Sequence, residues 1–362
     1  MRGYLDPQAS MFSYFSPEAR VPAAHPLRSI KGYADTALKS LSRDFDELYA
    51  CTGRPSIPPE RLLKASLLIA LYSVRSDRLF CEMLDYNILF RWFLDMSLEE
   101  RGLDQSNFLR LRERLLESKV AGRFFDAVVG ETRKLDLLSD EHFTVDGTLI
   151  EPGPRQRRAC AARTGHRMPP DPTIKAWSTS AANAAPTPPI PRPPIRIPSS
   201  CAKARQRIQA QLRWSALREN RHGLCVDLKI TAAVDTETEA AKAMLDRQRR
   251  KRIRPSTLGA DKGYHSKDFV AHLRRRKIAP HLAMIDGRKT PGMDRRTTRH
   301  DGYAVSQRKR KRVEEIFGWL KTIGLLRKLR HRGRQNVDWI FRFAAAAYNL
   351  IRIRNLAYAV GE

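Results

Sequence analysis

Apolar residues recur at helical spacing through the first third of the chain. From Pro59 to about residue 100 they fall three and four positions apart, beginning with Leu62 and Leu63, which places them on one face of a helix. Pro59 stands where a helix can begin, because proline is tolerated in the first turn. The pattern predicts that residues 35–135 are all helical.

The stretch DQSNFLRLRERLLES is also amphipathic, with Arg110, Arg112 and Arg114 between its apolar positions. Ser106 is a candidate N-cap, since its hydroxyl can accept a hydrogen bond from a free amide of the first turn. Two interpretations stay open. The segment is either the second helix of a DNA-binding helix-turn-helix or a bundle helix with a solvated basic face.

The period changes at His142, where HFTVDGTLI alternates apolar and polar residues and predicts a strand. GLCVDLKITAAVD, STLGADKGY and KIAPHLAM predict further strands, TEAAKAMLD predicts a helix, and Ser266 is expected to cap another helix through FVAHLRRR. Residues 306–325 and 337–356 are helical in pattern. Strands that alternate with helices predict an α/β sheet. We expect a helical N-terminal domain at 1–140 and an α/β domain at 141–358.

The segment between Pro152 and Ser200 has a different composition from its surroundings. Twelve of its 49 residues are proline, Asp171 is its one acidic residue, and neither helical nor strand periodicity is present. Such a composition cannot form a core. Residues 152–213 are therefore interpreted either as a Pro-rich, disordered insertion or as a stretch translated out of frame.

The charge of the chain is strongly positive and unevenly distributed. The formal net charge is +28 and the pI is about 10.5, while residues 1–150 carry 20 Lys and Arg against 22 Asp and Glu. The excess lies in the second part and predicts a nucleic-acid partner. The five cysteines form no CxxC pair, which argues against a zinc knuckle and fits a reducing cytoplasm. The N-terminal stretch MRGYLDPQASMF lacks an apolar signal core and no apolar run is long enough to span a bilayer, so we expect neither secretion nor membrane insertion.

Three acidic residues lie where an α/β sheet would gather them. Asp146 is on the first predicted strand, Asp261 ends a later strand, and Glu314 is in a C-terminal helix. Any one of them alone is better explained as a surface residue, a cap or half of an ion pair. Together they predict a site for two Mg²⁺ ions, which prefer carboxylate oxygens and support phosphodiester chemistry when about 3.5–4 Å apart.

The spacing around Glu314 adds to this prediction. Arg310 precedes it by four residues and Lys321 follows it by seven, so all three are expected on one face of a single helix. Residues 301–334 carry 11 Lys and Arg against three acids, a density suited to DNA phosphates. The expected DNA contacts are Arg308, Lys309, Lys311, Arg312, Arg327, Lys328, Arg330 and Arg332.

The motifs VDGTLIE, TLGADKGY and GYAVSQRKRKRVEEIFGWLKTIGLLRKLRHRG closely resemble the DDE transposases of bacterial insertion sequences, in the insertion-sequence-five-like branch. The N-terminal stretch from GRPSIPPE to WFLDM resembles the helical N-terminal domain of that group. The resemblance covers roughly residues 28–151 and 214–356. Gln307 stands where the family signature has tyrosine, with the spacing intact.

The resemblance implies a ribonuclease-H-like catalytic core that cleaves DNA ends and joins them to a target. It implies that Asp146 bridges two Mg²⁺ ions, with Mn²⁺ as a substitute, while Asp261 and Glu314 each complete one site. Arg310 and Lys321 support them. Double-stranded DNA would be the partner, with a homodimer or larger assembly holding both ends, in the bacterial cytoplasm at the nucleoid.

The chain departs from that family in the middle. CAKARQRIQAQLRW stands where relatives have a second strand and shows no alternation. We expect the second strand to be missing, so that the sheet folds poorly around Asp146 and the protein is weakly active or inactive. The alternatives are a transposase relic that binds DNA without catalysis, and a basic structural or RNA-associated protein.

Overall fold

The computed structural model describes residues 16–49, 56–150, 212–285, 293, 295–328 and 333–360. Up to residue 134 the described chain is helical, as the sequence predicts. The helices are α1 Pro17–Arg20, α2 Pro26–Lys39, α3 Ser42–Leu48, α4 Pro59–Leu71, α5 Asp77–Tyr86, α6 Ile88–Phe93, α7 Gln105–Leu116 and α8 Val120–Lys134.

The starts of these helices follow from local sequence. Helix α4 begins at Pro59, as predicted. Helix α7 is capped by Asp104, which accepts a 2.9 Å hydrogen bond from the amide of Asn107. The prediction that Ser106 is the cap is wrong, because the helix begins at Gln105 and Ser106 lies inside the first turn. Arg112 on this helix forms an ion pair with Asp77, so that arginine faces α5.

The strands form a five-stranded mixed sheet in the order β3-β2-β1-β4-β5. Strands β1, β2 and β3 pair antiparallel, whereas β4 and β5 run parallel to β1. This is the ribonuclease-H-like arrangement, and the predicted fold class is confirmed. The strands are β1 His142–Ile150, β2 Leu212–Glu219, β3 Cys225–Ala232, β4 Thr257–Ala260 and β5 Ala279–Leu282.

The prediction of a missing second strand is wrong. Strand β2 pairs with β1 from Phe143↔Glu219 to Ile150↔Leu212 and with β3 on its other side. The prediction rested on residues 201–214, whereas the strand begins at Leu212 and continues to Glu219. Successive residues from Trp214 on are all buried, including Arg218, which is 2% exposed and pairs with Glu315. The rest of the 152–213 segment, residues 152–211, lies outside the described residues.

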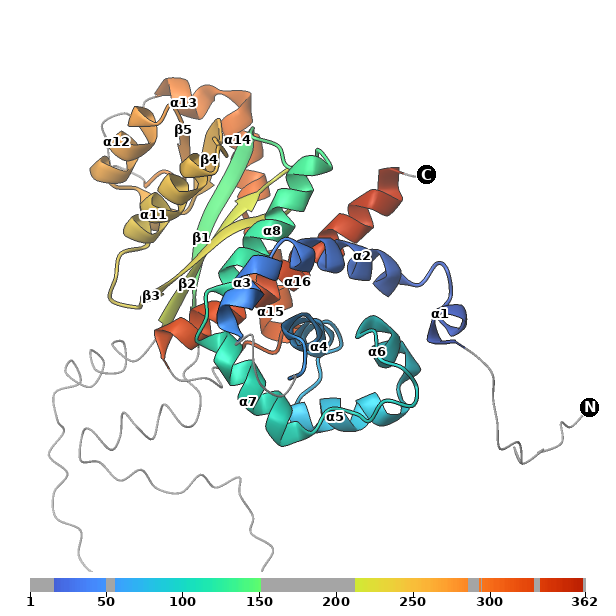
Figure 1. The fold of residues 1–362 in the computed structure, drawn as a ribbon. Coiled ribbons are helices and arrows are strands. Elements are labelled where there is room, and N and C mark those ends of the chain that lie inside the picture. Colours follow the sequence, from blue (N-terminus) through green and yellow to red (C-terminus); the bar gives the residue numbers. More distant parts are fainter. Residues whose placement is uncertain are drawn as a thin grey trace, which may run out of the picture.

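Helices cover both faces of the sheet (Figure 1). Helices α11 and α12 lie on one side, and α8, α15 and α16 on the other. Trp214 of β2 packs against Phe317 of α15 and Phe341 of α16. The remaining elements are α11 Glu237–Arg250, η1 Lys262–Tyr264, α12 Lys267–Arg275, α13 Arg295–Arg299, α14 Asp301–Arg310, α15 Val313–Thr322 and α16 Arg334–Val360.

The helical run predicted at 306–325 is two helices. Helix α14 ends at Arg310 and α15 begins at Val313. The Arg218 side chain donates a hydrogen bond to the carbonyl of Arg312 at the break. The same carbonyl accepts a 3.1 Å hydrogen bond from the amide of Glu315, so the bond from the sheet is a second one at the start of α15.

Helix α16 joins the N-terminal helices to the sheet. It packs against α2, α4, α7 and α8 as well as against β3 and α15. One hydrophobic core runs from Val21 to Ile353 through both predicted domains. None of the described helices is long and apolar enough to cross a bilayer.

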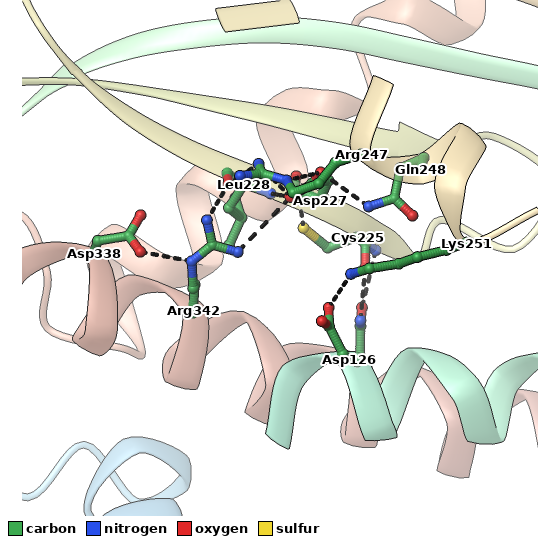
Figure 2. Close-up of polar contacts among 10 residues, drawn as sticks. Asp126, Cys225, Asp227, Leu228, Arg247, Gln248, Lys251, Asp338 and Arg342 are labelled. Carbon is green, nitrogen blue, oxygen red and sulfur yellow. Dashed lines mark hydrogen bonds and ion pairs between the residues drawn. The ribbon is translucent and has the colours of Figure 1, made fainter. Parts of the chain in front are cut away.

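A buried ionic network around Asp227 fastens α11 and α16 to the outer strand β3 (Figure 2). Arg247 of α11 donates two 2.8 Å hydrogen bonds to the Asp227 carboxylate, and Gln248 donates one of 2.9 Å. Arg342 of α16 lies 3.8 Å from the same carboxylate. Because Asp227 is 1% exposed, its charge depends on these partners. The network fixes the position of α11 over the sheet.

Candidate active site

Asp146 and Asp261 lie at the same level of neighbouring parallel strands. The register of β1 and β4 runs from His142↔Thr257 to Thr144↔Gly259. Two residues further along each strand come Asp146 and Asp261. The sheet therefore brings together two of the three predicted carboxylates.

Asp146 is largely buried, and burial raises its pKa to about 6. The backbone amide of Gly147 donates a 2.8 Å hydrogen bond to its carboxylate and opposes this shift. The nearby carboxylates of Glu237 and Asp261 raise the pKa further, whereas Arg310 lowers it. The charged form of Asp146 thus lacks a sufficient positive partner among the described residues.

Asp261 follows β4 directly and caps the short helix η1. Its carboxylate accepts a 2.6 Å hydrogen bond from the amide of Lys262 and lies 3.2 Å from the guanidinium of Arg310. Half of the side chain, 51%, is exposed. This carboxylate is fixed on one side and open to solvent on the other, as a residue that contacts a ligand must be.

Glu314 lies in the first turn of α15 with its side chain exposed. No group of three or more His, Cys, Asp or Glu side chains close enough to hold a metal occurs among the described residues. The structure therefore does not bring Glu314 together with Asp146 and Asp261. The predicted single helix face is also wrong, because the break after Arg310 separates that residue from Glu314 and Lys321.

Arg310 and Lys321 nevertheless both reach the sheet beside the carboxylates. The Lys321 ammonium donates a 2.8 Å hydrogen bond to the hydroxyl of Thr148, two residues beyond Asp146. The side chain of Gln307 donates a 2.6 Å hydrogen bond to the carbonyl of His281 on β5. These contacts hold α14 and α15 against the carboxyl ends of the strands.

Most of the predicted DNA contacts form an exposed basic surface on this side. Arg308 and Lys309 lie on the last turn of α14, and Lys311 and Arg312 occupy the break before α15. Arg327 and Lys328 follow α15 and are exposed as well. Arg330 and Arg332 lie outside the described residues. The exposed cations Arg308, Lys309, Lys311 and Arg312 flank Arg310, which pairs with Asp261.

Two protein families match this chain. Residues 15–114 match the family described as a transposase domain (DUF772), and residues 190–350 match the family described as a transposase DDE domain. The chain belongs to the DDE transposases. The second match contains Asp261 and Glu314, whereas Asp146 precedes it. The insertion-sequence-five-like branch stays a prediction.

Comparisons of this transposase with curated proteins and with solved structures add two findings. No curated protein matches the chain. A solved structure, described as the piggyBac transposase synaptic complex with hairpin DNA, aligns with 92% of this chain and 76% of its own chain, at 10% identity and a TM-score of 0.40.

Sequence reasoning missed two residues that lie beside the candidate site. Glu237 begins α11 and raises the pKa of Asp146 more than Asp261 does. Tyr264 is fully buried, and its hydroxyl makes no hydrogen bond within the described part of the chain. Glu237 reads as an ordinary acidic residue at a helix start. Its position near Asp146 becomes apparent only in the folded structure, where α11 lies over the sheet.

Proposed function

We propose that this transposase catalyses metal-dependent DNA cleavage and strand transfer at the terminal inverted repeats of its own insertion sequence. The observation that supports this most strongly is the placement of Asp146 on β1 and of Asp261 directly after β4, each two residues beyond the registered pair Thr144↔Gly259. Two carboxylates on adjacent strands, beside an exposed basic surface, suit phosphodiester chemistry on DNA.

The residues present fit a hard divalent cation. Their ligand atoms are carboxylate oxygens, and the raised pKa of Asp146 reflects burial and neighbouring negative charge that a cation would offset. Asp146 and Asp261 would hold Mg²⁺ or Mn²⁺, with Glu314 as a third ligand and two ions in the complete site. When bound, the ions activate a nucleophilic oxygen and stabilise the leaving oxygen.

The protein residues supply position and charge. The amide of Gly147 orients the Asp146 carboxylate, and the amide of Lys262 orients that of Asp261. Arg310 holds Asp261 until a DNA phosphate competes for the guanidinium, because arginine binds phosphate and carboxylate with the same planar set of donors. Lys321 fixes α15, the helix that carries Glu314, to β1.

The partner is double-stranded DNA, both as element ends and as target. The exposed cations from Arg308 to Arg312 would neutralise phosphates next to the carboxylates. Joining two ends to one target requires two active sites, so we propose a homodimer or larger assembly on DNA. The protein would act in the bacterial cytoplasm at the nucleoid.

One observation favours a second candidate, a relic that binds DNA without catalysis. Glu314 does not join the two aspartates in the described structure. Reading the nucleotides for residues 152–213 in the two other frames bears on this candidate. A polar linker in another frame would mark a frameshifted relic.

An excision assay in bacteria separates the two functions. A reporter gene interrupted by the ends of the element is restored when the chain excises the insert. The proposed function predicts excision with the wild-type chain and none with Asp146→Asn. A relic predicts no excision with either, and reduced excision when it competes with an active relative.

A further inference from the structure

A cleft of about 930 Å³ lies beside the sheet, where β1, β4 and β5 meet the helices that follow them. Helix α14 packs against all three strands, and α12 and α13 pack against β5 (Figure 1). The described lining of the cleft contains neither Asp146 nor Asp261. Because clefts of about 300–1,000 Å³ commonly hold small ligands, this one can take a group as large as a nucleotide.

The cleft carries an excess of positive charge. Arg274 of α12 and Lys309 of α14 line it, and both are exposed. The Lys309 ammonium pairs with no carboxylate of the described chain, and Arg274 donates a 3.1 Å hydrogen bond to the hydroxyl of Thr297. The one acidic residue of the described lining, Glu141, pairs with Arg221 at 2.8 Å. The charge of the two cations in the cleft is therefore open to an anion.

Three histidines line the same cleft. The rings of His142 and His281 lie 5.9 Å apart. A β-carbon built on Gly302 would lie 2.9 Å from Nδ1 of His300 and 3.9 Å from Cε1 of His281. Nδ1 of His300 accepts a 3.1 Å hydrogen bond from the amide of Gly302. The proton of the neutral His300 ring is therefore on Nε2, which can donate to a ligand.

Buried polar atoms of the lining lack partners. Nε2 of His142, Nδ1 of His281 and Oγ of Ser306 are buried and make no hydrogen bond within the described part of the chain. His281 is 6% exposed and Ser306 is 1% exposed. Buried polar groups are normally satisfied. Three such atoms around one cleft indicate a polar ligand together with the water that accompanies it.

The charges around the histidines point to an anion. Burial, followed by the charges of His281 and Lys309, lowers the pKa of His142 to about 4. Burial also lowers the pKa of His281, and the charges of His300 and Arg274 add to that shift. All of these neighbouring charges are positive, so an anion in the cleft would relieve their mutual repulsion.

We propose that this cleft binds a phosphate group, with Arg274, Lys309 and His300 as its donors. A phosphate can come from DNA or from a free phosphate compound. DNA is the proposed source, because Lys309 belongs to the exposed basic run from Arg308 to Arg312. The inference takes its DNA partner from the proposed function and adds to it a contact site on α12 and the start of α14.

Helix α14 connects this cleft to the candidate active site. Lys309 lines the cleft, and the next residue, Arg310, pairs with Asp261. A DNA phosphate in the cleft would therefore also hold the helix that reaches the carboxylates.

DNA binding by the full chain tests this inference without requiring cleavage. Fluorescence anisotropy with a labelled duplex at several salt concentrations compares the wild type, Arg274→Gln and Arg275→Gln. Arg275 is the next residue of α12 and is equally exposed, but it does not line the cleft, so it is the matched control. We expect Arg274→Gln to weaken binding several-fold and to lower the slope of log K against log salt by about 0.9, the value for one phosphate contact. Arg275→Gln should leave both unchanged, and equal effects in the two variants would overturn the inference.

A second variant keeps the fold of the cleft. His300→Asn retains a side-chain cap for α14 and removes the ring nitrogen that faces a ligand. We expect it to weaken DNA binding as well. If Arg274→Gln unfolds, as circular dichroism would show, His300→Asn decides alone, and unchanged binding overturns the inference.

Inorganic phosphate distinguishes the two sources of the ligand. The melting temperature of the full chain is measured with millimolar phosphate and with chloride at equal ionic strength. If phosphate raises it in the wild type but not in Arg274→Gln, while DNA binding is the same in both, the site holds and its ligand is a free phosphate compound. If Arg274→Gln changes neither DNA binding nor the effect of phosphate, the inference is overturned, and cleavage that requires Asp261 would leave the proposed function standing. If the wild type binds no DNA, the proposed function fails, whereas stabilisation by phosphate that Arg274→Gln abolishes would still support the site.

Discussion

The guanidinium of Arg310 lies 3.2 Å from the carboxylate of Asp261 and joins α14 to the end of β4. The pair is solvent-accessible at Asp261, so its contribution to folding is small. Because Arg310 lies between the exposed cations Arg308, Lys309, Lys311 and Arg312, we propose that it acts with DNA.

Replacing Arg310 by alanine should separate function from stability. We expect Arg310→Ala to change the free energy of unfolding by less than about 1 kcal/mol and to reduce DNA cleavage about tenfold or more. Urea unfolding and a cleavage assay measure the two effects. Arg310→Lys keeps the charge and should retain part of the activity. A large loss of stability in Arg310→Ala would assign the residue a structural role instead.

The raised pKa of Asp146 makes stability depend on pH. The carboxyl ionises near 3.8 in the unfolded chain and near 6 in the folded one, so the folded state loses stability as pH rises from about 4 to 6. Above pH 6 this loss in the free energy of unfolding reaches its full value of about 3 kcal/mol. Asp146→Asn removes it, and in EDTA the variant should gain stability over the wild type between pH 4.5 and 7.5. Added Mg²⁺ should reduce this gain. A difference that stays constant with pH would contradict the assignment.

The same ionisation should govern metal binding. Protons compete with a cation for Asp146, so Mn²⁺ affinity should fall as pH drops below about 6. A titration between pH 5 and 8 checks this. Affinity that is constant over this range would mean that Asp146 does not bind the ion.

Asp227 should be important for stability rather than for chemistry. Asp227→Ala leaves Arg247 and Arg342 without their buried partner, and we expect a loss of about 3 kcal/mol in urea unfolding. Glu239→Gln removes an exposed pair of the same helix and should cost less than about 1 kcal/mol. Equal losses in the two variants would show that the buried network stabilises the fold no more than an exposed ion pair does.

The basic surface should bind DNA through its charge. Changing Arg308, Lys309 and Lys311 to alanine together should weaken binding to any DNA sequence. The slope of log K against log salt should fall by up to about three, since each phosphate contact adds about 0.9. Fluorescence anisotropy at several salt concentrations measures the slope. An unchanged slope would mean that these three residues do not contact DNA phosphates and that the DNA interface lies elsewhere.

Regular patterns made much of the fold predictable from the sequence. The helices before residue 135 and strands β1 and β3 follow apolar periodicity, and Ser266 caps α12 as predicted. Strand β2 was missed because the prediction rested on residues 201–214, whereas the strand runs from Leu212 to Glu219. Its burial does not alternate, since Arg218 is buried by its pairing with Glu315, 97 residues away. At the break between α14 and α15 the carbonyl of Arg312 accepts a long-range hydrogen bond from Arg218, a contact that no local pattern predicts.

The candidate site was predictable in part for a similar reason. Asp146 and Asp261 are placed by strands, and strands can be recognised from local sequence. Glu237 is placed by the crossing of α11 over Gly147, and no local pattern encodes that distance. Glu314 shows the converse, since its sequence context is distinctive while its side chain lies exposed and apart from the aspartates.

Cleavage of DNA carrying the element ends is the most direct test of the central claim. The purified chain is incubated with this DNA and Mg²⁺, and Asp261→Asn serves as the matched variant, with DNA binding measured for both. We predict Mg²⁺-dependent cleavage by the wild type, none by Asp261→Asn, and equal DNA binding. Cleavage by Asp261→Asn at the wild-type rate, or no cleavage by a wild-type chain that binds the ends, would contradict it.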